Sequence, residues 1–164
     1  SHIHPRKGIK IDIQGELAFP IFTQEWNFKK IRLECSTYQQ LFSKNHILAF
    51  RYWMQHITGD APFYESSIIG GGWTIRGYKA DRFVDNTMAL YSLEYRFPVY
   101  KKLGAVIFTD SGRVWPSLKN FSVSDWHQNV GAGLRYYLTN FVVRFDLSYS
   151  KEGTRIFFNF GHVF

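Results

Sequence analysis

The chain has 164 residues, a net charge of +7 and an unusually high aromatic content of 19%. No Pro/Gly/Ser-rich stretch or charge block divides it, so we expect a single domain over residues 1–164. Its basic residues are scattered rather than clustered among aromatics, which argues against a nucleic-acid partner. Its apolar runs, such as 103–108, fall far short of the roughly 18 residues that a membrane-spanning helix needs. A single cysteine, Cys35, excludes an intrachain disulfide, and we expect no metal and no cofactor.

Eight segments alternate apolar and polar side chains with a period of two, which predicts eight strands. In residues 8–19, for example, Ile11 and Ile13 lie on one face, and Asp12 and Gln14 lie on the other. The remaining segments are 30–37, 46–57, 87–97, 103–114, 128–138, 141–149 and 155–164.

The length of these segments favours a membrane location. They run to about ten residues, more than a globular strand and about what a tilted strand needs to cross a bilayer. Short connections at 39–45, 98–102 and 139–140 contrast with long ones at 58–86 and 115–127, as in outer-membrane barrels. A soluble β-sandwich has the same periodicity. Aromatic residues near the expected strand ends favour the membrane: Phe19, Trp26, Tyr38, Trp53, Tyr95, Phe97, Trp115 and Trp126.

The alternation places charges of both signs on the face opposite the apolar one. An eight-stranded barrel is only wide enough to be filled by side chains, so these charges must pair with one another. We therefore predict a charged plug with no open pore. The expected inward residues are Lys10, Lys30, Arg32, Arg51, Arg96, Arg135 and Arg144, with Asp12, Glu16, Glu34, Glu94, Asp110 and Asp146.

A glycine-rich segment at 70–78 ends in Arg76, Gly77 and Tyr78. Glu94 and Asp110 both point inward on consecutive strands, where two like charges destabilise a sheet unless a cation lies between them. The forked guanidinium of Arg76 is suited to engage both acids, and Gly77 would let the loop tip descend into the barrel.

These motifs resemble the outer-membrane-protein assembly and two-partner secretion superfamily, the bacterial surface antigen family of BamA, TamA and FhaC. The resemblance implies that Arg76, Gly77 and Tyr78 form the tip of an inserted loop locked by Glu94 and Asp110. It extends to residues 131–135 and 144–146 and to a terminal strand closing on Phe164, the barrel terminus.

The chain departs from that family in two respects. Family barrels have sixteen strands and usually follow periplasmic repeats, whereas this chain matches the last eight strands and has no such repeats. It is therefore either a short member or the C-terminal half of a larger barrel. We expect a closed eight-stranded barrel that forms a homodimer, with loop 58–86 mostly outside unless two chains associate.

The expected function is that of a non-enzymatic, integral protein of the bacterial outer membrane that assists membrane-protein insertion or translocation. Its expected partners are outer-membrane lipids and client or assembly-machinery proteins. The alternatives are a passive pore or structural barrel, a fragment of a larger barrel, a soluble ligand-binding barrel and a lipid-modifying enzyme. An enzyme is disfavoured because the histidines have no Ser or acid partner at motif spacing: His46, His56, His127 and His162.

Overall fold

The computed structural model describes residues 7–20, 26–43 and 45–164. Within these ranges no helix is long and apolar enough to cross a membrane. The fold is all-β, with two short 3₁₀ helices, η1 (Phe63–Glu65) and η2 (Leu118–Asn120). The strands are β1 (Gly8–Ala18), β2 (Asn27–Gln40), β3 (Ile47–Asp60), β4 (Ser67–Ile69), β5 (Phe83–Asp85), β6 (Thr87–Tyr100), β7 (Leu103–Trp115), β8 (His127–Tyr137), β9 (Val142–Ser150) and β10 (Gly153–Phe160).

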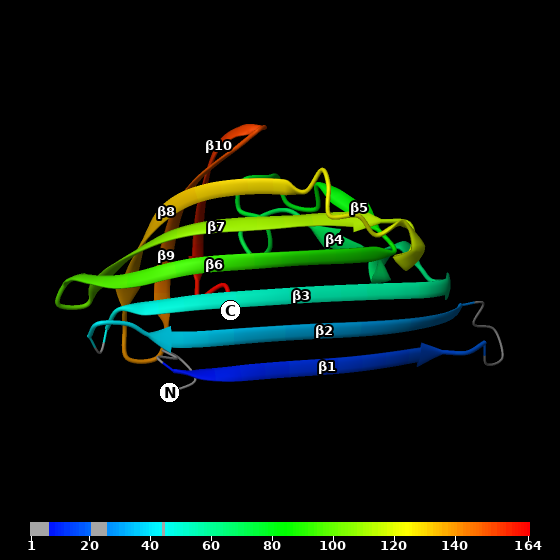
Figure 1. The fold of residues 1–164 in the computed structure, drawn as a ribbon, viewed down its shortest axis with the longest axis horizontal. Coiled ribbons are helices and arrows are strands. Elements are labelled where there is room, and N and C mark those ends of the chain that lie inside the picture. The colour runs from blue at the N-terminus through cyan, green and yellow to red at the C-terminus, as the bar shows by residue number, and fades with distance from the viewer. Residues whose placement is uncertain (1–6, 21–25, 44) are drawn as a thin grey trace.

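Eight of these strands form one antiparallel sheet in the order β1-β2-β3-β6-β7-β8-β9-β10 (Figure 1). Consecutive strands pair along almost their whole length, as in β2 and β3, where Asn27 lies opposite Asp60 and Gln40 opposite Ile47. The eight strands expected from the alternation are confirmed, with ends shifted by a few residues. Strands β4 and β5 form a separate small sheet within the long connection between β3 and β6.

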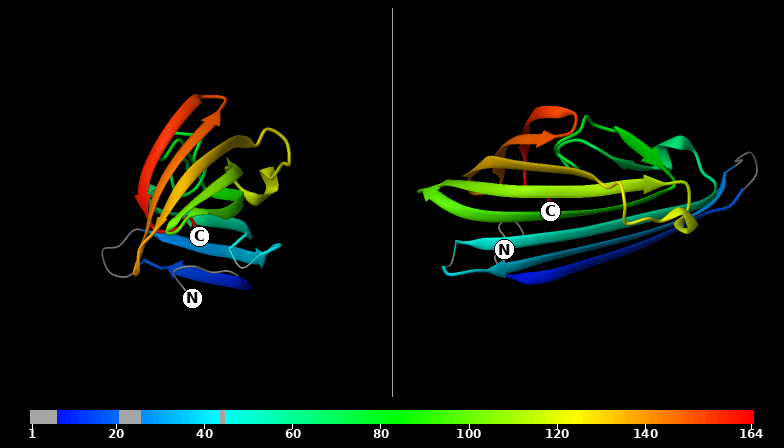
Figure 2. Two further views of the ribbon diagram at one scale, coloured as in Figure 1. Left: turned by 90° about the vertical axis from the view of Figure 1, so that its left-hand side faces the viewer. Right: turned by 45° about the horizontal axis from the view of Figure 1, so that its top comes forward.

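The sheet is strongly curved but open (Figure 2). Among the described residues β1 pairs only with β2 and β10 only with β9, so these two strands are the edges. The structure therefore does not show the expected closed barrel of eight strands. The reason is steric: a closed barrel of eight strands holds only its own side chains, whereas here residues from 67 to 85 lie on the concave side of the sheet.

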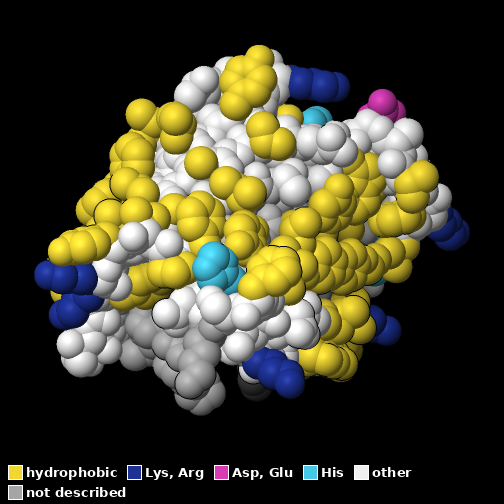
Figure 3. Space-filling model, turned by 60° about the vertical axis from the view of Figure 1, so that its left-hand side comes forward, with side chains coloured by type: hydrophobic (Ala, Val, Ile, Leu, Met, Phe, Trp, Pro, Cys, Tyr) yellow, Lys and Arg dark blue, Asp and Glu magenta, His cyan; other side chains and the backbone are white. Residues whose placement is uncertain are grey.

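The two faces of the sheet differ in chemistry as the alternation predicts. The convex face exposes a broad apolar surface, coloured yellow in Figure 3. Its exposed members include Ile9, Ile11, Ile13, Leu93, Ile107, Leu134, Phe145, Leu147, Ile156, Phe158 and Phe160. The concave face is polar throughout, and on β2, β3 and β6 to β9 it is buried at Ser36, Arg51, Gln55, Ser92, Glu94, Arg96, Asp110, Asn129, Arg135, Arg144, Asp146 and Ser148. On the edge strand β1, by contrast, the expected inward residues Lys10 and Glu16 are exposed. An exposed apolar surface of this extent is typical of a protein that meets lipid.

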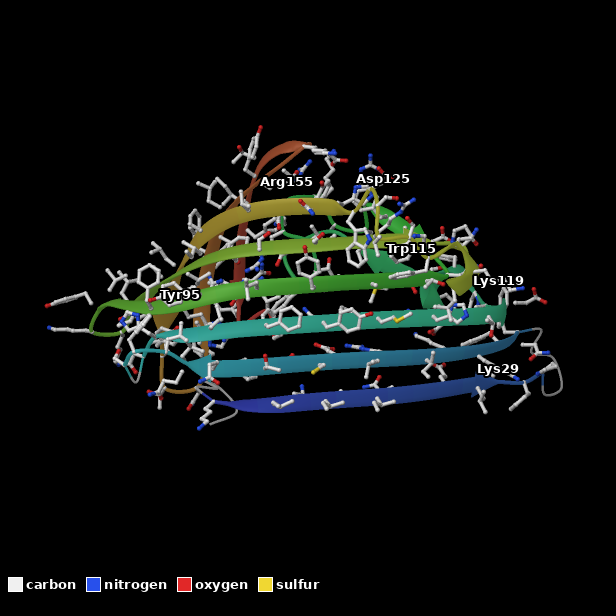
Figure 4. The ribbon with its side chains drawn as sticks, in the orientation of Figure 1. Lys29, Tyr95, Trp115, Lys119, Asp125 and Arg155 are labelled. Carbon is white, nitrogen blue, oxygen red and sulfur yellow. The ribbon has the colours of Figure 1, made fainter. Side chains whose placement is uncertain are left out.

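The expected aromatic belt is present only in part. Tyr95 and Phe97 stack on the convex face near one end of the sheet, and Figure 4 shows Tyr95 there. Tyr38 is instead buried beside Ile47 and Ala49 on the concave side, since its register partner Ala49 is fully buried there. Trp53 likewise packs against the buried cluster of the inserted segment. Alternation alone assigns these two residues to the inner face, and proximity to a strand end was the weaker signal.

The membrane assignment predicts opposite results for two neighbouring substitutions in β1. Ile13→Lys, on the convex face, is expected to lower the stability of the protein in lipid vesicles by roughly 2–4 kcal/mol, because a lysine there meets hydrocarbon. Gln14→Lys, on the concave face, is the control and should cost little. Both side chains are exposed in the isolated chain, so equal stabilities of the two variants in urea titrations from vesicles would contradict a lipid-facing convex surface.

The last strand ends at Phe160, four residues before the expected strand terminus at Phe164. Gly161 adopts a φ of 91°, a conformation that turns the chain away from the strand direction. Val163 is buried, and the ring of Phe164 lies 6.4 Å from that of Tyr38 on β2. The expectation that the terminal strand closes on Phe164 is therefore wrong for this structure.

This inward tail predicts a difference between two phenylalanines. Phe164→Ala should destabilise the protein by about 1–2 kcal/mol, since it removes apolar packing at Tyr38 and ring contacts with the guanidiniums of Arg51 and Arg96, at 5.8 and 5.3 Å. Phe160→Ala, on the convex face, should cost less because lipid solvates the vacated surface. Urea unfolding in vesicles measures both, and the reverse order of stabilities would show that the tail does not pack inward.

Candidate functional site

The segment between β4 and β5 reaches the concave side of the sheet through two tight glycine positions. Gly70 and Gly71 have φ values of 126° and 92°. A Cβ on Gly70 would lie 2.3 Å from the carbonyl oxygen of Lys79, so only glycine fits there. The hydroxyl of Thr74 accepts the Gly70 N–H at 2.8 Å and the Gly71 N–H donates to the Tyr78 carbonyl at 3.1 Å, which closes residues 70–78 into a compact loop.

Apolar side chains seat this loop on the sheet. Ile75 and Tyr78 are almost fully buried, and they join the sheet residues Met88 and Leu90 and the β4 residue Ile69 in one cluster. The Tyr78 hydroxyl donates a hydrogen bond to the Gln128 carbonyl at 3.3 Å. Tyr78 therefore satisfies its polar end while its ring fills the interior.

Arg76 extends from the loop tip to the inner face of β6 and β7. Its Nε and Nη2 donate to the two oxygens of Asp110 at 2.8 and 2.7 Å, a bidentate pair, and its Nη1 donates to Glu94 at 2.5 Å. Its backbone N–H also donates to Asp110 at 3.2 Å, and its guanidinium lies 3.4 Å from the ring centre of Phe108. Arg76, Glu94 and Asp110 are at most 1% exposed, so this ion-paired group is buried from the solvent.

Further charged residues surround this group. Glu94 also accepts from Arg96 Nε at 2.7 Å, while Asp146 lies 2.6 Å from Arg135 and 3.1 Å from Arg144. These guanidiniums and carboxylates alternate in space, which keeps each buried charge beside an opposite one. Burial opposes the charge on Arg76, yet Asp110 and Glu94 raise its pKa above the usual arginine value, so it stays protonated at any ordinary pH.

Gly77 is required by close approach rather than by a special backbone angle. A Cβ at this position would lie 2.5 Å from Cβ of Asn129 and 2.6 Å from Cβ of Ser150. The Ser150 hydroxyl donates to the Gly77 carbonyl at 2.6 Å. The loop tip therefore contacts the inner surfaces of β8 and β9 as directly as those of β6 and β7.

The structure brings together Arg76, Gly77, Tyr78, Glu94 and Asp110, and places Phe164 outside this group, against β2. Two participants, Asn129 and Ser150, were missed from the sequence; the contact of Ser150 with the Gly77 carbonyl is given above. Asn129 donates to Asp110 at 3.1 Å and to Ser148 at 2.8 Å, and its side-chain oxygen accepts the Asp110 N–H at 2.7 Å. The missed signal for Asn129 was its inward position in the alternation of β8, two residues before Gly131.

This group consists of buried arginines and acids in mutual contact, and we refer to Arg76, Gly77, Tyr78, Glu94 and Asp110 as the loop clamp. Glu94, Asp110 and Asp146 each lie within ion-pair distance of arginine donors. Two histidines make single contacts with hydroxyl groups, His46 with Tyr95 and His56 with Thr87, each at 2.7 Å. Among the described residues, no cluster of three or more metal-ligating side chains occurs.

An antiparallel sheet with an apolar convex face and a charged, loop-filled concave face defines the class of β-barrel membrane proteins. A family model described as the Omp85 superfamily domain matches residues 1–164, so the chain belongs to the Omp85 superfamily.

Solved structures agree with this fold. In all, 57 chains match, among them BamA from Haemophilus ducreyi lacking POTRA domains 1–3, at a TM-score of 0.78 and 18% identity. The match covers 95% of this chain, which spans 38% of the length of that one. None of the curated proteins compared with the chain matches it.

Proposed function

We propose that this chain is a non-enzymatic, integral component of the bacterial outer membrane that assists the insertion or translocation of other membrane proteins. Membership of the Omp85 superfamily supports the relation to outer-membrane protein assembly and translocation. The observation that carries the proposal furthest is the open sheet, in which β1 and β10 each have one edge that pairs with no other described strand, beside an apolar convex face.

Such edges are unstable in lipid. Every unpaired backbone N–H or C=O group in the hydrocarbon region costs several kcal/mol, so each edge has to pair with another strand. An incoming extended segment supplies such a strand by β-augmentation, with backbone hydrogen bonds that are independent of its sequence. An edge that accepts strands transiently is what assisted insertion requires.

In the resting state we propose that a second copy covers the edges. Strand β1 runs from the end of the sheet that carries the short turns toward the end that carries the long loops, and β10 runs in the opposite direction. Two copies in the same membrane orientation therefore pair β1 with the partner's β10 in antiparallel fashion at both seams. The result is one barrel of twice the strand number, wide enough for two inserted loops.

The loop clamp has a defined place in this proposal. Because Arg76, Gly77 and Tyr78 contact β6 to β9 from within, we propose that the clamp holds the middle strands rigid while the distant edges stay free to exchange partners. Glu94 and Asp110 are its anchors on the sheet. The role proposed for the clamp is structural.

Crosslinking tests how the edges close. In a Cys35→Ser background, we would place cysteines at Ile13 of β1 and Phe158 of β10, both on the convex face. Oxidation in membranes is expected to yield a covalent dimer. A fast-migrating monomer would instead show closure of one chain on itself, and the absence of both products would indicate that strands outside the 164 residues cover the edges. Either of the last two results overturns the homodimer.

Client folding tests the activity. Vesicles containing the protein should fold an unfolded outer-membrane protein faster than empty vesicles, and oxidation of the Ile13→Cys/Phe158→Cys variant should abolish the difference until reductant is added. An unchanged rate after oxidation would show that the edges are not the working surface. Single-channel recording tests the alternative of a passive pore. A pore predicts stable conductance, whereas the proposed structure predicts none because the buried charged residues fill the interior.

A further inference from the structure

One cavity lies away from the loop clamp, at the end of the sheet that carries the short turns. It has a volume of about 240 Å³ and is formed around the hairpin that joins β6 to β7. Its lining combines an apolar part with polar and cationic side chains, and consists of Asn45, Ile47, Arg96, Phe97, Pro98, Lys101, Lys102, Leu103, Tyr137 and His162. The lining contains cationic side chains and no carboxylate side chain.

The backbone of the hairpin shapes this cavity. The register of β6 and β7 shifts between Pro98 and Tyr100, so the hairpin bulges at Val99 just before its turn. Lys101 occupies the turn with a φ of 46°. Beside the bulge, Gly104 lets the ring of Tyr137 lie close to the sheet, because a Cβ there would approach that ring to 2.9 Å. The bulge and the glycine together leave room below the two lysines.

The charges of the two ends of the sheet are unequal. The short turns at 41–46, 98–102 and 138–141 and the tail at 161–164 contain lysine and histidine but no aspartate or glutamate. Figure 3 turns this end toward the viewer and shows dark-blue cationic groups along its margins. The opposite end carries both signs, and Figure 4 shows Lys119 and Asp125 there. Its acids are Asp60, Glu65, Asp81, Asp85, Asp125 and Glu152.

The two lysines have no anionic partner of their own. Within the described part of the chain no carboxylate lies within ion-pair distance of Lys101 or Lys102, whereas Lys30 and Arg82 elsewhere are paired. Arg96, which is 3% exposed, forms part of the cavity wall while its Nε binds Glu94 at 2.7 Å and its Nη2 donates to the Phe164 carbonyl at 3.4 Å. The cavity therefore presents a positive potential with little opposing charge.

The depth of the cavity in the membrane indicates which ligand it can bind. Stacked Tyr95 and Phe97 on β6, and Phe141 beside Phe160, form an aromatic belt at this end of the convex face. Such belts mark the boundary between hydrocarbon and headgroups, so the lysines just beyond them lie at the level of lipid phosphates. The volume is below that of a site for a drug-sized molecule, which suits a headgroup whose acyl chains stay outside.

We propose that this cavity binds the phosphate-diester headgroup of an anionic phospholipid. Lys101 and Lys102 contact the phosphate, Arg96 supplies positive potential from the wall, and Phe97 and Leu103 meet the start of the acyl chains. The inference rests on the proposed membrane location and adds a specific lipid partner to it. The bound lipid would hold the β6–β7 hairpin, and with it the clamped strands, at a constant depth in the membrane.

Lipid titration of the purified full chain in detergent tests this inference. Native mass spectrometry would compare dihexanoyl-phosphatidylglycerol, dihexanoyl-phosphatidylcholine and glycerol 3-phosphate. We expect the anionic lipid to bind roughly tenfold more tightly than the zwitterionic one, as two lysines near a headgroup predict. Lys101→Gln/Lys102→Gln should remove this preference. Lys151→Gln, in the β9–β10 turn at the opposite end, is the matched control and should preserve it.

Three outcomes would overturn the inference. Equal binding of the two lipids excludes a headgroup site, and an equal loss in Lys151→Gln reduces the effect to general surface charge. Displacement of the lipid by glycerol 3-phosphate at equal concentration would show a free-phosphate site instead. A chain that does not enter bilayers contradicts the proposed function, whereas one that enters without headgroup preference contradicts this inference alone.

Discussion

Asp110→Ala is expected to destabilise the folded protein by roughly 3–5 kcal/mol, the usual cost of removing one partner from a buried ion pair. The carboxylate accepts three hydrogen bonds from Arg76 and a fourth from Asn129, and all of these donors are buried. Its loss leaves a guanidinium without its bidentate partner in a buried interior. Urea unfolding in vesicles, followed by the heat-dependent shift in gel migration, measures the effect.

Asp125→Asn is the control for this prediction, because asparagine removes the charge and still tolerates the φ of 55° at this position. Asp125 pairs with Arg113 at 3.6 Å, but its side chain is 84% exposed, so the loss of its charge should change stability by less than about 0.5 kcal/mol. Arg76→Ala should be nearly as damaging as Asp110→Ala, and the double variant should cost much less than the sum of the two. The proposed clamp is wrong if Arg76→Ala leaves stability unchanged while Asp110→Ala lowers it.

Gly77→Ala is expected to release the loop from the concave face. The added methyl group would overlap backbone-proximal carbons of Asn129 and Ser150, which belong to paired strands and cannot move independently. Overpacking of this kind typically costs about 1–3 kcal/mol. Because the loop holds Arg76 in place, we also expect faster proteolysis within residues 70–82, measured by limited digestion from the loop side.

Gly15→Ala provides the comparison, since a Cβ at Gly15 on β1 has no neighbour within 4 Å. It should leave both stability and proteolysis unchanged. Replacing Ser150 by glycine in the Gly77→Ala background removes one of the two clashing carbons and should restore part of the lost stability. If Gly77→Ala behaves like Gly15→Ala, the tip of the loop does not rest on β8 and β9.

Much of the sheet was predictable because the signal for a strand, its alternation of side chains, lies within one short segment of the sequence. A strand with one lipid face and one polar face repeats every two residues, so β1 shows its orientation through Ile11, Asp12 and Ile13 without any knowledge of its neighbours. The same alternation placed Glu94 and Asp110 on one face. Their proximity to each other and to Arg76 then followed from the unfavourable electrostatics of two buried acids.

The errors arose where distant segments compete for the same volume. We expected a closed barrel whose loop 58–86 stays mostly outside unless two chains associate, because an eight-stranded interior is full. The chain resolves this conflict in the other direction: the loop enters and the sheet stays open. Phe164 was placed on the last strand by its alternation with Phe158 and Phe160, but the turn at Gly161 and the contact with Tyr38 direct it inward.

The sequence by itself determined the strands, their two faces and the residues of the clamp, since each depends on the spacing of side chains within one segment and on the sign of their charges. Only the tertiary structure decided whether the sheet closes, that Asn129 and Ser150 support the loop, and that a cationic cavity forms under the β6–β7 hairpin. These features depend on packing between residues far apart in the chain, where sequence spacing carries no distance information.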